Sequence, residues 1–424
     1  MNAGGRDRTR DVSRRGAALC SVALVWVGVP GAAHAESYSI ESSSDVRVEA
    51  NDNVSLQPRS PGTVKTLALS TTVGASRRAE NSATLLGATV TALQQWGRGA
   101  NDRIDGRIGV TQSFNDALNT VTASVQYAQD FNNTVQNADV TVNPGERRTA
   151  TASVGWGRPL TERLSANAQV SFSQTAYAQQ TSAGVAPAND FRNASASAGL
   201  SYALTEIDTV SVQVSHSDYR AAGGGNQSST NEVSVSASRV LSNRSSASLQ
   251  LGVYQTDSSS PRIRFACPAA PVLCQLGLVQ LILIRDRVQS SGTGLSYGAS
   301  YRYQLGETSS LSFSLGSQQS PSGAEGVVQN KSLSLSLGHS FSETMNGALS
   351  FAMSRSTSQS TVLNQRSQRK TVAVSLSRQL SRDFSLLSNY QWTEGNSGGG
   401  SGTAHSNSIG VALKYDWPTF QASR

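Results

Sequence analysis

Four charged residues have the types and spacing that could act on a passing solute. Arg103, Asp105 and Arg107 stand at every second position of one segment, and Arg47 lies in an earlier segment of the same alternating kind. Side chains two residues apart in a β-strand point to one face, so these charges share the face that carries small polar residues. They could form a field that selects ions, or they could pair with neighbours and hold the wall. The sequence leaves both roles open.

Catalytic chemistry has little support in the residues after position 35. A hydrolase triad needs Ser, His and a carboxylate or amide close together. The histidines of this region, His216, His339 and His405, have no acidic or serine motif beside them, and serine is too abundant to mark a nucleophile. We therefore expect no enzymatic activity, no cofactor and no metal.

Two cysteines, Cys267 and Cys274, lie seven positions apart in a segment that also contains Pro268 and Pro271. We expect this segment, residues 258–289, to be a long loop on the extracellular side. In an oxidising compartment the two thiols are expected to form a disulfide. A metal site is the alternative, but two thiolates with no nearby histidine make a poor ligand set.

The most apolar stretch after the first 35 residues follows these cysteines. It could fold into a barrel mouth as a gate or plug, extend a neighbouring strand pair, or dock on a partner, and the sequence does not choose among these. Its apolar side chains are those of Leu276, Leu278, Leu281, Ile282 and Ile284.

These residues must be positioned by β-strands, because the chain alternates small polar and apolar residues almost to its C-terminus. Between Ser332 and Phe341 it reads S-L-S-L-S-L-G-H-S-F. The leucines of such a strand can face lipid while the serines face a wet interior. Interior positions of other segments are also mostly neutral, as at Ser165, Asn167 and Gln169. The pattern indicates a wall between two solvents.

Turn residues divide the alternating region into about eighteen segments, an even number that suits bacterial barrels. We therefore expect an all-β fold, a transmembrane antiparallel up-and-down β-barrel of about 18 strands that occupies residues 36–424. The expected strands begin near Tyr38, Thr63, Ser82, Arg103, Leu118, Arg147, Arg163, Phe191, Asp208, Thr230, Ser245, Ser290, Ser309, Gln329, Met345, Gln368, Asp383 and His405.

The expected connections alternate between short and long along the chain. Short ones such as Ser242–Arg244 and Ser342–Thr344 should be periplasmic turns, whereas long ones such as Gln179–Asp190 and Pro321–Val328 should face outside. Both termini of the barrel are then expected in the periplasm, with the protein in the outer membrane.

The first 35 residues resemble a cleaved secretory signal. Five arginines precede an apolar run that ends at Ala33-His34-Ala35, and the run is too short to span a bilayer as a helix. Removing five arginines and two aspartates with this segment lowers the formal net charge from +7 to +4. The remaining basic residues form no stripe, so we expect a lipid environment and no nucleic-acid partner.

The last expected strand ends in an aromatic pattern with Tyr415 and Trp417 on its outward face, and Phe420 follows Pro418. This ending resembles the C-terminal signal that the barrel assembly machinery reads. The resemblance implies that this machinery is a partner and that Tyr415, Trp417 and Phe420 carry the signal.

The segment Val46–Leu56 contains Asn51-Asp52-Asn53-Val54. It resembles the early strand and turn of a family of outer-membrane β-barrel proteins associated with exopolysaccharide and PEP-CTERM (exosortase) systems. The resemblance implies a pore for polysaccharide export, with polysaccharide and periplasmic export proteins as partners. A structural or receptor barrel that binds ligand through its outer loops, or a general diffusion porin, is the alternative.

Overall fold

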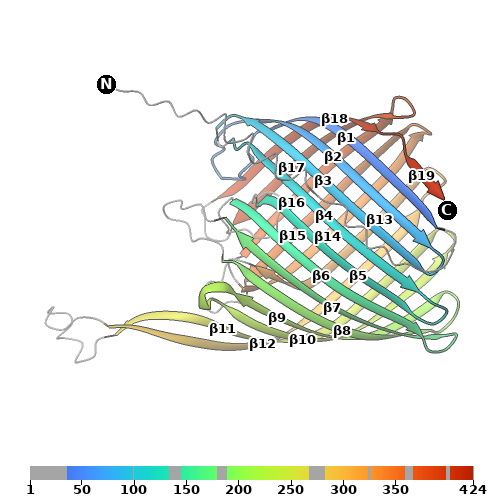
Figure 1. Cartoon of the computed structure of the whole chain (residues 1–424). Coiled ribbons are helices and arrows are strands. Elements are labelled where there is room, and N and C mark those ends of the chain that lie inside the picture. The colour runs from blue at the N-terminus through green and yellow to red at the C-terminus, as the bar shows by residue number, and fades with distance from the viewer. Residues whose placement is uncertain are drawn as a thin grey trace, which may run out of the picture. The chain divides into compact units, whose positions relative to one another are not determined.

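The computed structural model describes residues 36–98, 100–132, 145–178, 189–266, 282–322, 326–358, 366–397 and 402–423. These residues form one antiparallel sheet that closes on itself as a barrel (Figure 1). Its strands are β1 (Ser37–Asn51), β2 (Val64–Ala79), β3 (Ser82–Trp96), β4 (Arg103–Asn115), β5 (Thr120–Asn132), β6 (Gly145–Pro159), β7 (Leu164–Tyr177), β8 (Phe191–Ala203), β9 (Asp208–Ala221), β10 (Gln227–Ser242), β11 (Ser245–Ala266), β12 (Ile282–Gln304), β13 (Ser309–Ser322), β14 (Gly326–Ser342), β15 (Met345–Ser358), β16 (Arg366–Gln379), β17 (Phe384–Ser397), β18 (Thr403–Asp416) and β19 (Phe420–Ser423).

The barrel closes where β1 pairs with the last part of the chain. β1 pairs with β2 along one edge, and its other edge pairs with β18 from Ser43 to Asn51 and with β19 from Ser37 to Ile40. Closure leaves few free edges, which is how a sheet can satisfy its backbone hydrogen bonds inside a bilayer. Eighteen strands span the wall, and the short β19 completes the edge of β1.

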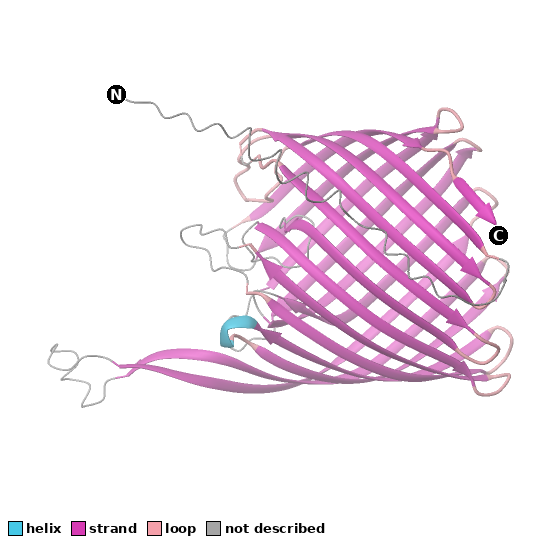
Figure 2. Ribbon diagram, viewed as in Figure 1, coloured by secondary structure: helices cyan, strands magenta, loops and turns pink. Residues whose placement is uncertain are grey.

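The described chain is almost entirely strand. Figure 2 shows one short helical turn, η1 (Ala222–Gly224), between β9 and β10. Among the described residues, no helix has the length and apolar character needed to cross a membrane.

The expected barrel of about 18 antiparallel strands is confirmed. The expected strands are all present and begin within about three residues of the predicted positions, except β12, which begins at Ile282 and not near Ser290. The sequence also did not predict β19. Pro418 cannot donate a ladder hydrogen bond and interrupts the chain after β18, but the residues beyond it resume pairing with β1.

Short and long connections alternate as expected except between β13 and β14, where only residues 323–325 separate the two strands. One end of the barrel, which we call the short-turn end, carries tight connections such as Glu80-Asn81 between β2 and β3. The other end, the long-loop end, carries longer ones such as residues 52–63 between β1 and β2. β1 begins and β18 ends at the short-turn end, as Figure 1 shows.

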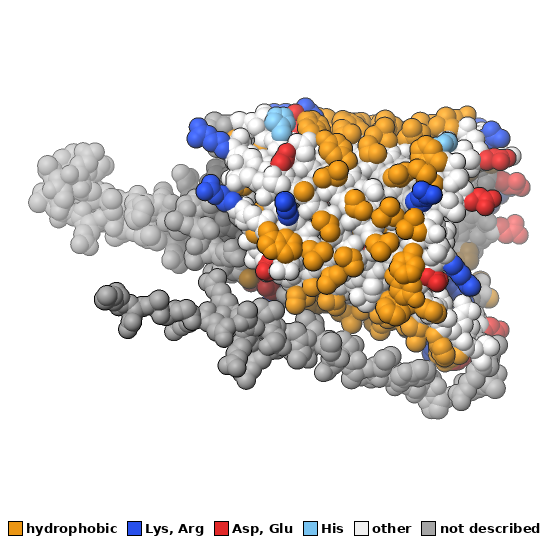
Figure 3. Space-filling model, turned by 90° about the horizontal axis from the view of Figure 1, so that it is seen from above, with side chains coloured by type: hydrophobic (Ala, Val, Ile, Leu, Met, Phe, Trp, Pro, Cys, Tyr) orange, Lys and Arg blue, Asp and Glu red, His pale blue; other side chains and the backbone are white. Residues whose placement is uncertain are grey.

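The two faces of the wall differ in composition. Along β18, burial alternates residue by residue: Ile409, Val411 and Leu413 are exposed on the outer face, whereas Ser406 and Ser408 are buried on the inner face. Apolar side chains spread over the middle of the outer wall in Figure 3, and charged side chains gather nearer its two ends. This is the surface expected of a wall in contact with lipid.

The wall divides between β12 and β13 toward the long-loop end. β12 pairs with β13 only from Tyr297 to Gln304, whereas it pairs with β11 all the way from Tyr303 to Ile282. Beyond this point β11 and β12 continue as a two-stranded hairpin that runs out past the other strands (Figure 1). β13 and β14 stay paired with each other up to Ser322 and Gly326.

The expected loop 258–289 therefore needs correction. β11 continues to Ala266 and β12 starts at Ile282. Residues 258–266 and 282–289 of the expected loop are therefore strand. The expected connection Pro321–Val328 is also mostly strand. Both errors have one cause, because polar turn-like residues such as Ser258 and Pro321 can extend a strand pair once tertiary pairing supplies the hydrogen bonds.

Candidate functional site

The inner wall of the barrel is the candidate site. Pairs of serines on neighbouring strands make this wall polar and uncharged over much of its surface. Inward serines on neighbouring strands bond to each other through their hydroxyls in several places. Examples are Ser124 with Ser153 at 2.7 Å, Ser171 with Ser195 at 2.6 Å, and Ser201 with Ser211 at 2.9 Å. Each hydroxyl retains further capacity to donate or accept. The wall therefore offers neutral hydrogen-bonding groups to whatever fills the lumen.

The four charges singled out in the sequence all lie on this inner wall, in β1 and β4. Arg103 and Asp105 form an ion pair, with Nε and Oδ2 3.2 Å apart. The strand registers put Arg47 level with Arg103, through Ala68 of β2 and Leu93 of β3. At about 4.8 Å per strand, three strand spacings separate them by roughly 14 Å. The structure thus joins two of the four charges and keeps Arg47 apart.

The two roles considered for these charges, ion selection and holding the wall, fall to different residues. Arg103 and Asp105 hold each other, and the Arg103 guanidinium also lies 5.0 Å from the centroid of the Phe131 ring. Arg47 and Arg107 are exposed and have no ion-pair partner among the described residues. The first pair fits the wall-holding role, whereas the two exposed guanidiniums are available to anions in the lumen.

Sequence reasoning missed other inward charges of the same region. Asp130 of β5 and Arg147 of β6 form a two-point ion pair at 2.9 and 2.7 Å, and both lie on the inner parity of their strands. Glu49 of β1 accepts a hydrogen bond from Ser408 of β18 at 2.7 Å. The alternation of each strand already indicated their inward direction, but only the register shows which strands bring partners together.

The motif Asn51-Asp52-Asn53 fastens the barrel seam at the long-loop end. The Asn53 side chain is buried, and its Nδ2 donates to the carbonyls of Gln57 and His405, each at 2.8 Å. Its Oδ1 accepts from the Gln57 backbone N–H at 3.0 Å. The Asp52 carboxylate accepts two hydrogen bonds from Asn407, both at 2.7 Å. The motif links the turn after β1 to β18 and so has a structural role in closure.

The expected C-terminal signal residues lie on the outer face near the short-turn end. Tyr415 contacts Phe384 and Trp417, with ring centroids 4.8 and 5.0 Å apart. Phe420 of β19 is exposed and pairs with Ile40 of β1. The three aromatic residues are therefore together at the closing strands, and their recognition by the assembly machinery stays a prediction.

The cysteine and apolar-loop predictions fall largely outside the described residues. Cys267, Cys274, Leu276, Leu278 and Leu281 all lie there. Ile282 and Ile284 are paired with Ala266 and Arg264 in the β11–β12 hairpin. At these two positions the chain extends a strand pair, which was one of the three alternatives.

The three histidines of the described chain lie on separate strands. Each occupies one of the alternate positions at which its strand carries exposed apolar residues on the outer face. His216 bonds to Asn231 at 2.8 Å, His339 to Ser309 at 2.7 Å, and His405 stacks on Trp392 with centroids 6.2 Å apart. No group of three or more metal-ligating side chains occurs in the part of the chain that the structure describes.

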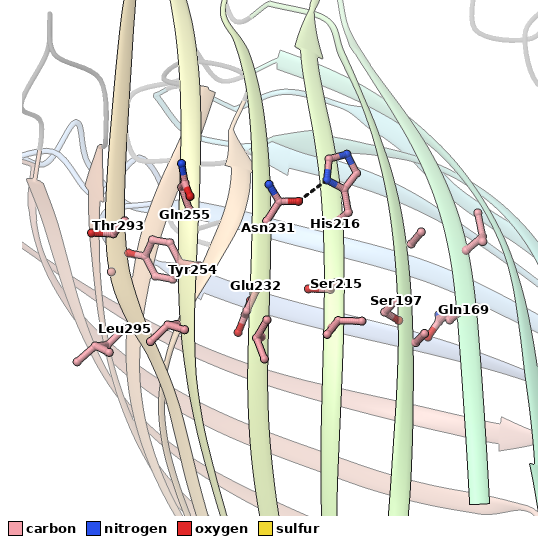
Figure 4. Close-up of a pocket in the computed structure, with 17 residues that line it drawn as sticks. Gln169, Ser197, Ser215, His216, Asn231, Glu232, Tyr254, Gln255, Thr293 and Leu295 are labelled. Carbon is pink, nitrogen blue, oxygen red and sulfur yellow. Dashed lines mark hydrogen bonds between the residues drawn. The ribbon is translucent and has the colours of Figure 1, made fainter.

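A broad depression across β7 to β12 has a different character from the lumen (Figure 4). Its apolar lining comes from residues exposed on the outer face, among them Val170, Val214 and Leu295. The His216–Asn231 hydrogen bond lies at its edge toward the long-loop end, where the outer face becomes polar. The apolar part of this lining belongs to the outer face.

The barrel is similar to solved outer-membrane channels. OccAB1 from Acinetobacter baumannii is 12% identical, with a TM-score of 0.45 over 90% of this chain and 97% of that chain. OpdK from Pseudomonas aeruginosa is 9% identical, with a TM-score of 0.46 over 90% and 99%. The copper transporter OprC is 8% identical, with a TM-score of 0.46 over 89% and 81%. No protein-family model and no curated protein matches the sequence. These likenesses concern the barrel fold alone.

Proposed function

We propose that the chain forms a pore in the outer membrane through which a hydroxyl-rich polymer passes during exopolysaccharide export. The observation that carries the proposal is a closed 18-strand wall with an apolar outer face and a neutral, serine-lined inner face. Barrels of 16 to 18 strands are wide enough for an aqueous channel. A polymer in such a lumen can exchange hydrogen bonds with water for bonds to wall hydroxyls at little net cost.

Passage in this mechanism is passive and needs no cofactor or catalytic residue. Direction comes from synthesis of the polymer and from periplasmic export proteins that contact the short turns. This requires the short-turn end and both barrel termini to face the periplasm, and the barrel assembly machinery to insert the chain. The exposed Arg47 and Arg107 give the lumen a preference for anionic solutes.

A diffusion pore for small polar solutes is the second candidate. It is favoured by the end of the β13–β14 hairpin, which lies against the inner wall and reduces the space for a polymer. The two candidates differ in how they treat oligosaccharides. A polymer pore is blocked transiently as a long chain enters, whereas a small-solute pore passes salts without such events.

The test is single-channel conductance of the refolded protein in planar bilayers, with neutral and acidic oligosaccharides added to either side. Stepwise conductance with length-dependent transient block supports the polymer pore. Conductance without block supports the small-solute pore, and a silent bilayer contradicts both in favour of a structural or receptor barrel.

Ion selectivity gives an independent measurement in the same bilayers. Arg47→Ser combined with Arg107→Ser should shift the reversal potential in a salt gradient toward cations. A unit charge about 4 Å from an ion in water contributes about 1 kcal/mol, roughly five-fold in local ion concentration. Arg378→Ser is the matched control, because Arg378 is exposed on the outward parity of β16. An equal shift in the control would contradict the role given to the inward arginines.

A further inference from the structure

The end of the β13–β14 hairpin, residues 318–322 and 326–330, forms a second layer inside the barrel. The parity of β13 makes Gln319 an outward residue, since Leu311, Phe313 and Leu315 of the same parity face outside. Its Oε1 nevertheless accepts hydrogen bonds from Thr230 at 3.1 Å and Thr256 at 2.9 Å.

These two threonines fix the position of the hairpin end. Thr230 of β10 and Thr256 of β11 are cross-strand neighbours on the inner face, and Thr256 is almost fully buried. β12 lies between β11 and β13 in the sheet, so Gln319 reaches them only if the hairpin end has crossed inside β12. The outer face of the hairpin end therefore packs against the inner face of the wall.

An apolar contact holds the second strand of the hairpin end in the same way. Val327 of β14 packs against a buried cluster formed by Phe191, Tyr219 and Ala221 of β8 and β9. The Phe191 and Tyr219 rings lie 5.3 Å apart, and Tyr219 is only 1% exposed. β14 contacts β9 and β10 although four and three strands, respectively, lie between them in the sheet. The hairpin end thus reaches across the lumen side of the wall.

Two inward positions of β12, opposite residues of β11, are glycines. The inward positions of β12 opposite Thr256 and Tyr254 are Gly292 and Gly294, which carry no side chain. The Tyr254 ring fills the space over Gly294, since a Cβ there would lie 2.3 Å from its hydroxyl oxygen. Nothing lies within 4 Å of the Cβ position of Gly292. A side chain at Gly294 would therefore collide with the Tyr254 ring, whereas the Cβ position at Gly292 is open.

The opposite face of the hairpin end is tied to the adjoining wall. Asn330 of β14 donates a hydrogen bond to Ser320 of β13 and accepts one from Ser356 of β15. On the same face as Gln319, Gln329 donates to Ser317 of β13 at 3.1 Å and so links the two strands of the hairpin. The hairpin end is therefore attached on both sides, to β9–β11 through Gln319 and Val327 and to β15 through Asn330.

We propose that this hairpin end is the constriction of the lumen and sets the largest solute that can pass. The inference rests on the proposed pore function, which it deepens by assigning size selection to Gln319, Val327 and the strands that carry them. The β11–β12 hairpin leads to the apolar segment that the sequence analysis considered as a gate. This hairpin runs out past the other strands and does not fold into the lumen. Size selection instead comes from the hairpin that follows it.

The test replaces residues 318–330 with Asn-Gly, so that the paired residues Ser317 and Lys331 are joined by a two-residue turn. Heat-modified migration in detergent gels checks that the shortened barrel has folded. Single-channel conductance and exclusion of polyethylene glycols of increasing size are then measured for both proteins. We expect at least a two-fold higher conductance and a larger exclusion size for the shortened barrel.

The outcomes separate this inference from the pore function. Equal conductance and equal exclusion size in the two proteins would overturn the constriction and leave the pore in place. A silent native barrel with a conducting shortened barrel would support the constriction and contradict an open pore. Two silent barrels would overturn both.

Point variants provide a test that does not shorten the chain. Gln319→Ala combined with Val327→Ser removes both anchors and should raise the exclusion size and the current noise. Gln255→Ala is the matched control, because Gln255 is exposed on the outer parity of the neighbouring strand β11. A control as strongly affected as the double variant would contradict the assignment.

Discussion

The barrel seam provides the sharpest stability prediction. Asn53 is 2% exposed and makes three side-chain hydrogen bonds that join the turn after β1 to Gln57 and to the His405 carbonyl of β18. Asn53→Ala removes these bonds. The carbonyls of Gln57 and His405 and the N–H of Gln57 then lose the Asn53 side chain as a partner. A typical net contribution is about 0.5–1.5 kcal/mol per bond, so the expected loss is about 2–4 kcal/mol of unfolding free energy.

Urea unfolding in lipid vesicles, followed by tryptophan fluorescence, measures this loss. The matched control is Asn396→Ala, since Asn396 is exposed at the same end of the barrel and its side chain makes no hydrogen bond or ion pair with another described residue. The control should change the unfolding free energy by less than about 0.5 kcal/mol, as surface substitutions usually do. If Asn53→Ala costs no more than the control, the motif does not fasten the seam and the reasoning is refuted.

Three further perturbations test the packing, the closure and a turn. Gly294→Ala should cost about 1–3 kcal/mol in urea unfolding, because the new methyl group meets the Tyr254 ring and overpacked sites behave this way; an unchanged midpoint would contradict the contact. Deleting β19 should lower the heat-modification temperature, because the first residues of β1 lose their pairing on one edge and stay paired with β2 alone; a temperature equal to that of the full chain would show that β18 alone closes the barrel. The pKa of Asp116 is lowered chiefly by the hydrogen bond from the Leu118 N–H, so its carboxylate stabilises the turn above the ordinary aspartate pKa and this is lost as pH falls through the lowered value. Asp116→Asn should therefore reduce stability near neutral pH and flatten the acid dependence of unfolding, and parallel pH profiles would count against it.

The sequence by itself determined the barrel and most of its strands. Alternation at every second residue is a local property, since it follows from the pleat of a single strand, and it identified both the inner wall and the outer aromatics Tyr415 and Trp417. Strand starts such as Ser82, Asp208 and Met345 were correct because a turn residue and a change of pattern coincide there. The inward direction of Arg47, Arg103, Asp105 and Arg107 followed from the same rule.

Tertiary structure alone decided which strands meet and where the wall divides. The pairing of Asp130 in β5 with Arg147 in β6 and the isolation of Arg47 depend on which strands are neighbours and on their register. Gln319 reads as an outward residue from its strand and becomes an inner-wall contact only because β13 leaves β12. Parity fixes the face of a side chain relative to its own strand, whereas the side of the barrel it reaches depends on the path of that strand. That path is set by non-local pairing, which a single strand does not encode.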